Sequence, residues 1–434
     1  MMKFIMFLLF MTPLCLSHFW ILFQVSLLFL LEFTIWMMSL NFLSCISYGM
    51  GIDMLSYGLL CLSLLIGSLM VISMVNCNWM GIFLFINLCM IFCLSVIFTT
   101  MNFMYMYISF EFVLVPLLIL ILGWGYQPER LLSGMYLFFY TVLVSLPILI
   151  LIIYMNNLGY SLFFDTLVMH SNFFLLHFIL MLVFMVKFPM FLVHYWLPKA
   201  HVQAPVSGSM ILAGLMLKIG GYGLIRVSYI FEGMFLNYSY LWYSISMLGS
   251  VYIGLVCLVQ GDMKCLIAYS SISHMGMVIM GLLTMGLWGL NGSFLLMIGH
   301  GFCSSGLFYM SNIFYLKTKS RSFYINKGLM NYLPSSSLFW FLLCAFNMSC
   351  PPSLNFLSEV MILISMISFW ESSMYFFILL SFLCACFSYY LYSSIFHGMS
   401  HNLYSFSSVT VIEYLCVLLH LFPLVFCPLL LSMF

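Results

Sequence analysis

Lysine and histidine side chains lie within one stretch that is apolar enough to be buried in a membrane. The stretch from Lys187 to Arg226 reads KFPMFLVHYWLPKAHVQAPVSGSMILAGLMLKIGGYGLIR. An ionisable group at the bilayer centre costs about 2.5–3.5 kcal/mol on insertion scales, so it normally faces the protein interior and often marks an ion pathway. The ionisable residues of the stretch are Lys187, His194, Lys199, His201 and Lys218.

Three prolines, Pro189, Pro198 and Pro205, interrupt this stretch. A proline removes a backbone donor and breaks or kinks a helix, and in hydrocarbon the freed carbonyl groups need new partners. Broken membrane helices therefore line enclosed or hydrated cavities. Lysines and histidines beside such breaks predict a pathway for protons or other ions.

The composition is that of a polytopic membrane protein. Of 434 residues, 65% are hydrophobic and only 5% are charged. A net charge of +1 provides no basic arm, so nucleic acid is not an expected partner. The 15 cysteines form no CxxC pair, so we expect no iron–sulfur cluster. The seven-residue spacing of His170 and His177 and of His194 and His201 could suggest a metal or haem site, but no second ligand pair lies on a facing helix, so we expect none.

Apolar runs of about 20 residues predict transmembrane helices. We read the first run as a helix rather than as a cleaved signal peptide, because another apolar run follows at once. The fourteen predicted spans are Phe4 to Leu16, Phe19 to Met37, Met54 to Val75, Met80 to Phe98, Asn102 to Leu122, Leu131 to Tyr154, Phe174 to His194, Val206 to Val227, Leu241 to Gln260, Leu266 to Gly286, Gly292 to Leu316, Ser336 to Trp370, Met374 to Phe396 and Val411 to Met433.

The predicted fold is an all-α integral membrane protein with about fourteen transmembrane helices and inverted repeats. Two helices are expected to be broken by proline, near Pro189 and near Pro351 and Pro352. Many transporters consist of two such inverted halves. We divide the single membrane domain 1–434 into N-terminal helices 1–79, a first five-helix repeat 80–230, a second five-helix repeat 241–396 and a C-terminal helix 411–433.

Basic residues are unevenly distributed between the two sets of predicted loops. Loops after even-numbered spans, together with the N-terminus, hold only Lys3 and Arg226. Loops after odd-numbered spans hold Arg130, Lys199, Lys264, Lys317, Lys319, Arg321 and Lys327. Positive loops stay on the cytoplasmic side or its equivalent, so both termini are expected on the opposite side.

Two glutamates are predicted inside spans. Glu111 lies about 13 Å from either end of its span, beyond the reach of its short side chain. Glu359 follows the break at Pro351 and Pro352. Each is either a proton-transfer group or a structural carboxylate that is hydrogen-bonded within the helix bundle.

Lys218 shares one helix face with Gly214 and Gly221, so it should point into protein rather than lipid. Lys187 lies nearer the end of its span, where snorkelling to the membrane surface is the alternative. The histidines His194, His201, His274 and His300 are candidates for proton transfer, because imidazole exchanges protons near neutral pH. Their alternative role is a hydrogen bond between helices.

The sequence resembles the subunit 4 family of NADH dehydrogenases, which are antiporter-like, proton-pumping membrane subunits of mitochondrial complex I. The resemblance rests on Lys187 to Arg226 and spans roughly Tyr105 to Met361. Four further segments carry it: GWGYQPERLLSGMYLFFYT, QGDMKCLIAYSSISHM, GHGFCSSGLFY and PPSLNFLSE.

The resemblance implies a proton relay of Glu111, Lys187, Lys218, His300 and Glu359 across the bilayer midplane, with Glu111 paired to Lys187. It implies no cofactor in this chain, with FMN, iron–sulfur clusters, NADH and ubiquinone in partner subunits. The implied partners are other membrane and peripheral subunits of complex I, including neighbouring antiporter-like subunits, and membrane lipids. The implied location is the mitochondrial inner membrane. The alternatives are a subunit of a multisubunit Na+/H+ antiporter and a structural membrane scaffold.

Overall fold

A computed structural model of the chain describes residues 2–16, 19–36, 44–75, 77–167, 173–400 and 407–428. In these ranges, nine helical spans are long and apolar enough to cross a membrane, and five shorter apolar helices accompany them. The fourteen elements correspond one to one with the fourteen predicted spans, which confirms the all-α membrane fold. The predicted ends of the second span at Met37 and of the last at Met433 lie outside the described residues.

The chain forms two compact units. Unit 1 comprises the described parts of Met1–Phe188 and Gln203–Tyr238, and unit 2 those of Pro189–Val202 and Ser239–Met433. The chain passes between the units on either side of the proline-rich segment after Lys187, and again after Tyr238.

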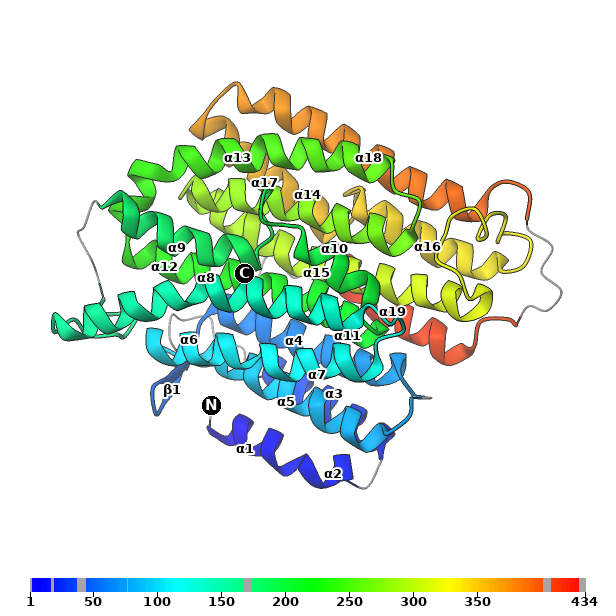
Figure 1. The fold of residues 1–434 in the computed structure, drawn as a ribbon, viewed down its shortest axis with the longest axis horizontal. Coiled ribbons are helices and arrows are strands. Elements are labelled where there is room, and N and C mark those ends of the chain that lie inside the picture. The colour runs from blue at the N-terminus through cyan, green and yellow to red at the C-terminus, as the bar shows by residue number, and fades with distance from the viewer. Residues whose placement is uncertain are drawn as a thin grey trace. The chain divides into compact units, whose positions relative to one another are not determined.

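Unit 1 is built on helices that pack side by side (Figure 1). Helix α4 contacts α3, α5 and α11, and α9 contacts α8 and α12. The segment from Val206 to Ile230 is buried except for Tyr229. The elements are α1 (Met2–Phe10), α2 (Thr12–Leu16), α3 (Trp20–Trp36), α4 (Met54–Ser73), α5 (Met80–Thr99), α6 (Phe103–Phe112), α7 (Leu114–Trp124), α8 (Arg130–Asn157), α9 (Phe174–Lys187), α11 (Val206–Ile211), the π-helical η1 (Leu212–Met216) and α12 (Leu217–Ile230).

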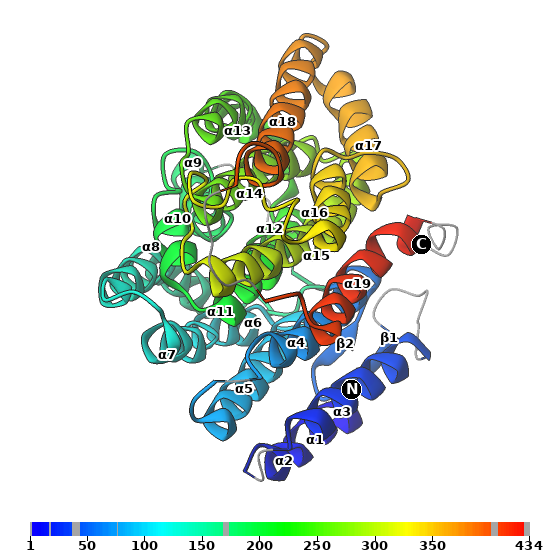
Figure 2. The ribbon, with the colours of Figure 1, turned by 90° about the vertical axis from the view of Figure 1, so that its right-hand side faces the viewer.

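Unit 2 is built around α15, which contacts α14, α16, α17 and α19 (Figure 2). Helix α15 is buried throughout its central part, so its side chains are enclosed by protein. The elements are α10 (Trp196–Gln203), most of α13 (Glu232–Leu258), α14 (Met263–Leu283), α15 (Leu287–Thr318), α16 (Pro334–Asn347), α17 (Leu354–Phe369), α18 (Ser373–Phe396) and α19 (Val411–Phe426).

Both predicted proline breaks are present. Helix α9 ends at Lys187, two residues before Pro189, because the residue that precedes a proline is excluded from helical geometry. Helix α16 ends at Asn347 and α17 begins at Leu354, after Pro351 and Pro352.

Some predicted boundaries are wrong. The seventh span was predicted to continue to His194, but seven residues earlier the proline ends the helix. Pro198 was predicted to interrupt a helix, but it lies in the first turn of α10, where its missing N–H costs nothing. Helix α13 begins at Glu232 rather than at Leu241.

A short antiparallel hairpin was not predicted. Its strands are β1 (Ser44–Ser47) and β2 (Met50–Ile52). Tyr48 and Gly49 form the turn, and both have positive φ angles. The hairpin leads directly into Asp53, the residue before α4.

Candidate functional site

Lys187 is the last residue of α9, and it is buried at 4% exposure. Its ammonium donates a hydrogen bond to the Phe110 carbonyl at 2.9 Å and lies 2.9 Å above the centre of the Phe110 ring. The alternative of a lysine that extends to the membrane surface therefore does not apply.

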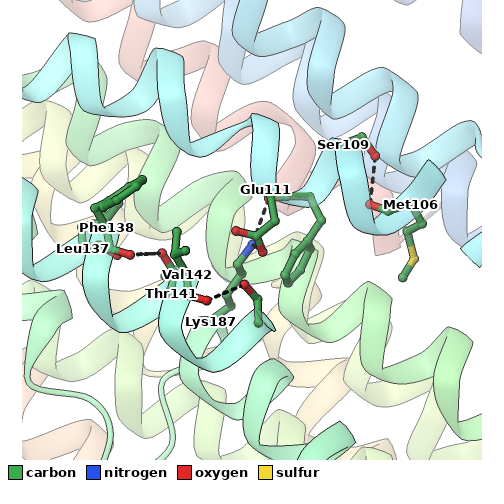
Figure 3. A network of polar contacts seen from close by, with 10 residues as sticks. Met106, Ser109, Glu111, Leu137, Phe138, Thr141, Val142 and Lys187 are labelled. Atoms are coloured by element: carbon green, nitrogen blue, oxygen red, sulfur yellow. Dashed lines mark hydrogen bonds and ion pairs between the residues drawn. The ribbon is translucent and has the colours of Figure 1, made fainter. Parts of the chain in front are cut away.

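Glu111 is the ion-pair partner of Lys187, with 3.5 Å between Nζ and Oε1. Figure 3 shows the two side chains pointing toward each other. The Glu111 side chain is 21% exposed, and its buried Oε2 has no hydrogen-bond partner among the described residues. The carboxylate thus has one oxygen on the lysine and one available for a proton or a water molecule.

The backbone explains why the Phe110 carbonyl can accept from a side chain. Helix α6 ends at Phe112, and α7 begins at Leu114. Phe110 therefore lies in the last turn of α6, where the carbonyl groups have no partner within the helix. Pro116, in the first turn of α7, has no N–H to donate to the Phe112 carbonyl, which adds to the interruption. The sequence analysis treated residues 102–122 as one span and missed this interruption.

Lys218 is completely buried in α12. Its ammonium donates to the carbonyl of Ala213, which lies in the π-helical segment η1. A π-turn shifts the backbone hydrogen bonds by one residue, and such turns are frequent at functional sites. The predicted protein-facing orientation of Lys218 is correct.

Helix α12 lies very close to the end of α9. A Cβ on Gly220 would be 2.9 Å from the backbone nitrogen of Phe188, and one on Gly223 would be 2.3 Å from the Phe184 ring. Only glycine allows this approach, which fixes the helix of Lys218 against the residue that follows Lys187. These two glycines differ from Gly214 and Gly221, the glycines predicted to share the face of Lys218.

Unit 2 holds a second cluster of ionisable groups, made of His274, His300 and Glu359. The two imidazole rings lie 5.5 Å apart between centroids. Nδ1 of His274 is 3.9 Å from Oε1 of Glu359, which is an electrostatic contact rather than a hydrogen bond. Both histidines are 1% exposed.

Glycine residues of α15 bring α17 close enough to form this cluster. A Cβ on Gly299 would lie 2.1 Å from Oδ1 of Asn355, one helical turn before Glu359. The Asn355 side chain also donates to the Phe346 carbonyl at 2.8 Å and thereby connects α17 to the end of α16.

His194 and His201 are buried against aromatic rings. His194 lies in the segment between α9 and α10 and stacks on Tyr195 and Phe191, at 4.4 and 5.7 Å between centroids. His201, in α10, stacks on Phe308 at 4.6 Å and 3°. The candidate residues thus form one pair in unit 1 and one triad in unit 2. Lys218, His194 and His201 belong to neither group: Lys218 contacts the Ala213 carbonyl, and the two histidines contact aromatic rings.

Two buried cations were missed by the sequence analysis. Arg226 was counted as a loop residue but lies within α12, 8% exposed, in an ion pair with Asp53. Lys264 was also counted as a loop residue but lies in the first turn of α14, 2% exposed. The signal for the first was Asp53, an acidic residue directly before an apolar run; the sequence carries no comparable signal for the second.

Within the described ranges, no group of three or more His, Cys, Asp or Glu side chains is arranged to hold a metal ion. The chemistry available in both clusters is proton binding and release by carboxylate, ammonium and imidazole groups.

Two family profiles match the chain. Residues 100–388 match the transmembrane family "NADH:quinone oxidoreductase/Mrp antiporter", and residues 1–99 match "NADH-ubiquinone oxidoreductase chain 4, amino terminus". The chain is 49% identical to NADH-ubiquinone oxidoreductase chain 4 of Ceratitis capitata, over 98% of this chain and 97% of that one. It is 48% identical to the protein of the same name from Aedes aegypti, over 89% and 88%.

Solved structures show the same fold. A chain of "Respiratory complex I from Thermus thermophilus with bound NADH" matches with a TM-score of 0.89 at 20% identity, over 99% of this chain and 96% of that one. A chain of the membrane-bound sulfane sulfur reductase, an archaeal respiratory membrane complex, matches with a TM-score of 0.81 at 18% identity, over 93% and 70%. With the identity and coverage of the insect relatives, these matches place the chain in the NADH-ubiquinone oxidoreductase chain 4 family.

Proposed function

We propose that this chain is a proton-translocating membrane subunit of NADH:ubiquinone oxidoreductase, respiratory complex I, and that it is a multi-pass protein of the mitochondrial inner membrane. The observation that carries the proposal is the buried ion pair of Lys187 and Glu111 at a helix break. The family membership supports the same function.

The pair in unit 1 suits a proton-loading site. A carboxylate 3.5 Å from an ammonium stabilises the charged lysine, and loss of that contact favours release of the lysine proton. Because Lys187 is the last residue of its helix, a shift of the helix end would open the pair. Glu111, partly exposed, then takes up a proton itself.

The triad in unit 2 suits transfer of a proton between neutral and charged groups. Imidazole accepts a proton on one nitrogen and releases one from the other, and Glu359 is placed to stabilise a protonated His274. We assign proton transfer to Glu111, Lys187 and Lys218 in unit 1, and to His274, His300 and Glu359 in unit 2. His194 and His201 are assigned to the same task at the proline-rich segment.

The energy for translocation comes from elsewhere in the complex. Moving one charge against 100 mV costs about 2.3 kcal/mol, which proton-transfer groups alone cannot supply. We assign NADH oxidation and ubiquinone reduction, with FMN and iron–sulfur clusters, to partner subunits. Neighbouring antiporter-like subunits and lipids cover the apolar outer faces.

A Na+/H+ antiporter subunit is the second candidate, since the profile of residues 100–388 covers both groups. The match of residues 1–99 to the chain 4 amino terminus favours complex I. Stimulation of proton flux by Na+ in the absence of NADH would favour the antiporter.

The test is proton pumping per NADH oxidised in membranes that carry Lys187→Met, with assembly of the complex checked on a native gel. The substitution keeps an apolar stem of similar length and removes the charge. We expect an assembled complex with reduced pumping. Lys319→Gln, at an exposed lysine, is the control and should pump normally; wild-type pumping by Lys187→Met would contradict the proposal.

A further inference from the structure

Arg321 contacts the ends of two helices from the loop that joins α15 to α16 (Figure 1). Its Nη1 donates a hydrogen bond to the Val202 carbonyl at 2.6 Å. Its backbone carbonyl accepts a hydrogen bond from the Met263 N–H at 3.1 Å. Val202 lies in the last turn of α10, and Met263 is the first residue of α14. The side chain and the backbone of one loop residue therefore contact different helices of unit 2.

Both contacts satisfy backbone groups that the helices themselves leave without a partner. The first four N–H groups and the last four carbonyl groups of an α-helix have no partner within it. Because α10 ends at Gln203, shortly before Pro205, the Val202 carbonyl is one of these groups, and the Met263 N–H at the start of α14 is another. A cation also suits the negative end of the α10 dipole. Arg321 thus caps α10 with its side chain and α14 with its backbone.

The loop holds the backbone of Arg321 in a fixed position. Ser322 forms an antiparallel bridge with Asp262, the residue before α14. The side-chain amide of the buried Asn326 donates to the carbonyls of Ser320 and Ser322, at 3.1 and 2.9 Å. Because the residues on both sides of Arg321 are held, little further conformational entropy is lost when its guanidinium binds the end of α10.

The two capped helices carry histidines that we assign to proton transfer. His201 directly precedes Val202, and its buried ring stacks on Phe308 of α15 at 4.6 Å and 3°. His274 lies in α14. Helix α10 has only 8 residues, and a helix of this length is marginal without outside contacts. A shift of its last turn would move the His201 ring away from Phe308.

A role as a mere orienting charge does not account for these contacts. Lys319 and Lys327 lie in the same loop and are exposed, whereas Arg321 is half-buried. The positive-inside rule counts charges and requires no fixed partner for any of them. The two hydrogen bonds of Arg321 therefore indicate a positional task in addition to its charge.

We propose that Arg321 is a positioning residue of the proton relay, whose guanidinium fixes the end of α10 and thereby keeps the His201 ring on Phe308. The inference rests on the proposed function and adds to it a group that neither binds nor releases the transported proton. Arginine stays charged in proteins, so the contact with the Val202 carbonyl persists while neighbouring groups change their protonation.

The test measures proton pumping per NADH oxidised by the intact complex in membranes that carry Arg321→Met, with assembly checked on a native gel. The substitution removes the charge and the side-chain donors but leaves the backbone bond to Met263 in place. We expect pumping to be about threefold to tenfold slower, because proton transfer depends on close placement of its groups. Arg321→Lys, which again brings a cation to the Val202 carbonyl, should restore most of the rate. Lys327→Met removes a positive charge from the same loop and should match the wild type.

A double-mutant cycle with His201→Gln separates positioning from a general structural defect. If Arg321 acts through His201, the double variant should pump little more slowly than His201→Gln alone, because the cap then has no relay group left to position. A defect spread over the whole subunit would instead multiply with the loss in His201→Gln. Arg321→Gln, which keeps a donor without the charge, carries the cycle if Arg321→Met does not assemble.

Wild-type pumping by whichever of these two Arg321 variants assembles would overturn the proposal. An equal loss in Lys327→Met, multiplicative losses in the cycle, or wild-type pumping by His201→Gln would do the same. Lys187→Met in the same membranes tests the proposed function separately. If Lys187→Met is impaired and the Arg321 variant is not, only the positioning role is wrong. If Lys187→Met pumps normally, the proposed function itself is wrong.

Discussion

At the scale of single residues, Glu111 and Lys187 form one ion pair, in which each charge is stabilised by the other. The Lys187 ammonium has the Phe110 carbonyl, the Phe110 ring and the Glu111 carboxylate around it. A buried charge that loses its partner destabilises the folded protein by about 3–5 kcal/mol. A substitution at either residue therefore leaves the other charge without its ion-pair partner.

Non-additivity is therefore expected for Glu111→Gln and Lys187→Met. Each single change should lower the coupled rate by roughly tenfold, equivalent to about 1.4 kcal/mol, and the double change should cost little more than either one. The measurement is the NADH-driven pumping rate of the four variants of the cycle. Independent, multiplicative losses would show that the two residues do not work as a pair. Glu129→Gln is the matched control, because the Glu129 carboxylate accepts a hydrogen bond from the Gln203 amide at 3.1 Å but has no lysine partner in the proposed relay.

At the scale of helices, the close contact between α12 and the end of α9 positions two lysines at once. The contact exists because Gly220 has no side chain facing the Phe188 backbone. A rigid backbone cannot move aside as a side chain can, so extra volume here must displace a helix.

Gly220→Ala should consequently destabilise the subunit by about 1–3 kcal/mol, the usual range for overpacking, and lower pumping even though no ionisable group is changed. The amount of assembled complex on a native gel and its thermal inactivation measure the effect. Gly123→Ala, where an added Cβ meets nothing within 4 Å, is the control. Equal behaviour of the two variants would show that the α9–α12 contact does not depend on this glycine.

The sequence predicted the spans well, because hydropathy over about 20 residues is a strong signal. It also predicted the break at Pro189, because a proline lacks a backbone N–H and keeps the residue before it out of helical geometry. The π-helical segment Leu212–Met216 was missed because no residue in it marks a departure from α-helix. The interruption at Val113 was missed although Pro116 follows it within one helical turn. The pairing of residues distant in sequence, such as Asp53 and Arg226, could be identified only from the three-dimensional structure.

The same limit applies to the site. Glu111, Lys218 and Glu359 became candidates because a charge inside an apolar run is conspicuous. Which of them meet could not be read from the spacing: His274 reaches Glu359 only because α17 packs against α15 at small residues such as Gly299.

At the scale of the whole molecule, the uneven distribution of basic loops predicts an orientation. We propose that the loops holding Lys319 and Lys327 face the matrix, as the positive-inside rule requires. The last residue of α8, Asn157, and the loop that follows it, which contains Asp165, would then face the intermembrane space.

A membrane-impermeant maleimide tests this orientation. Asn157→Cys should be labelled in mitoplasts, where the outer face of the inner membrane is exposed, and Lys327→Cys only in inverted inner-membrane vesicles. Both positions are exposed, and the wild type supplies the background from the native cysteines. The reverse labelling pattern would mean that the orientation is inverted.

The most direct measurement of the central claim is proton pumping per NADH oxidised in membranes that carry Lys218→Ala, with assembly checked on a native gel. Lys218 is completely buried, and its ammonium contacts the π-helical Ala213 carbonyl. If ionisable groups inside the membrane translocate protons, the assembled variant should pump less while Lys327→Ala pumps normally. An assembled Lys218→Ala complex with wild-type pumping and coupled turnover would contradict the account.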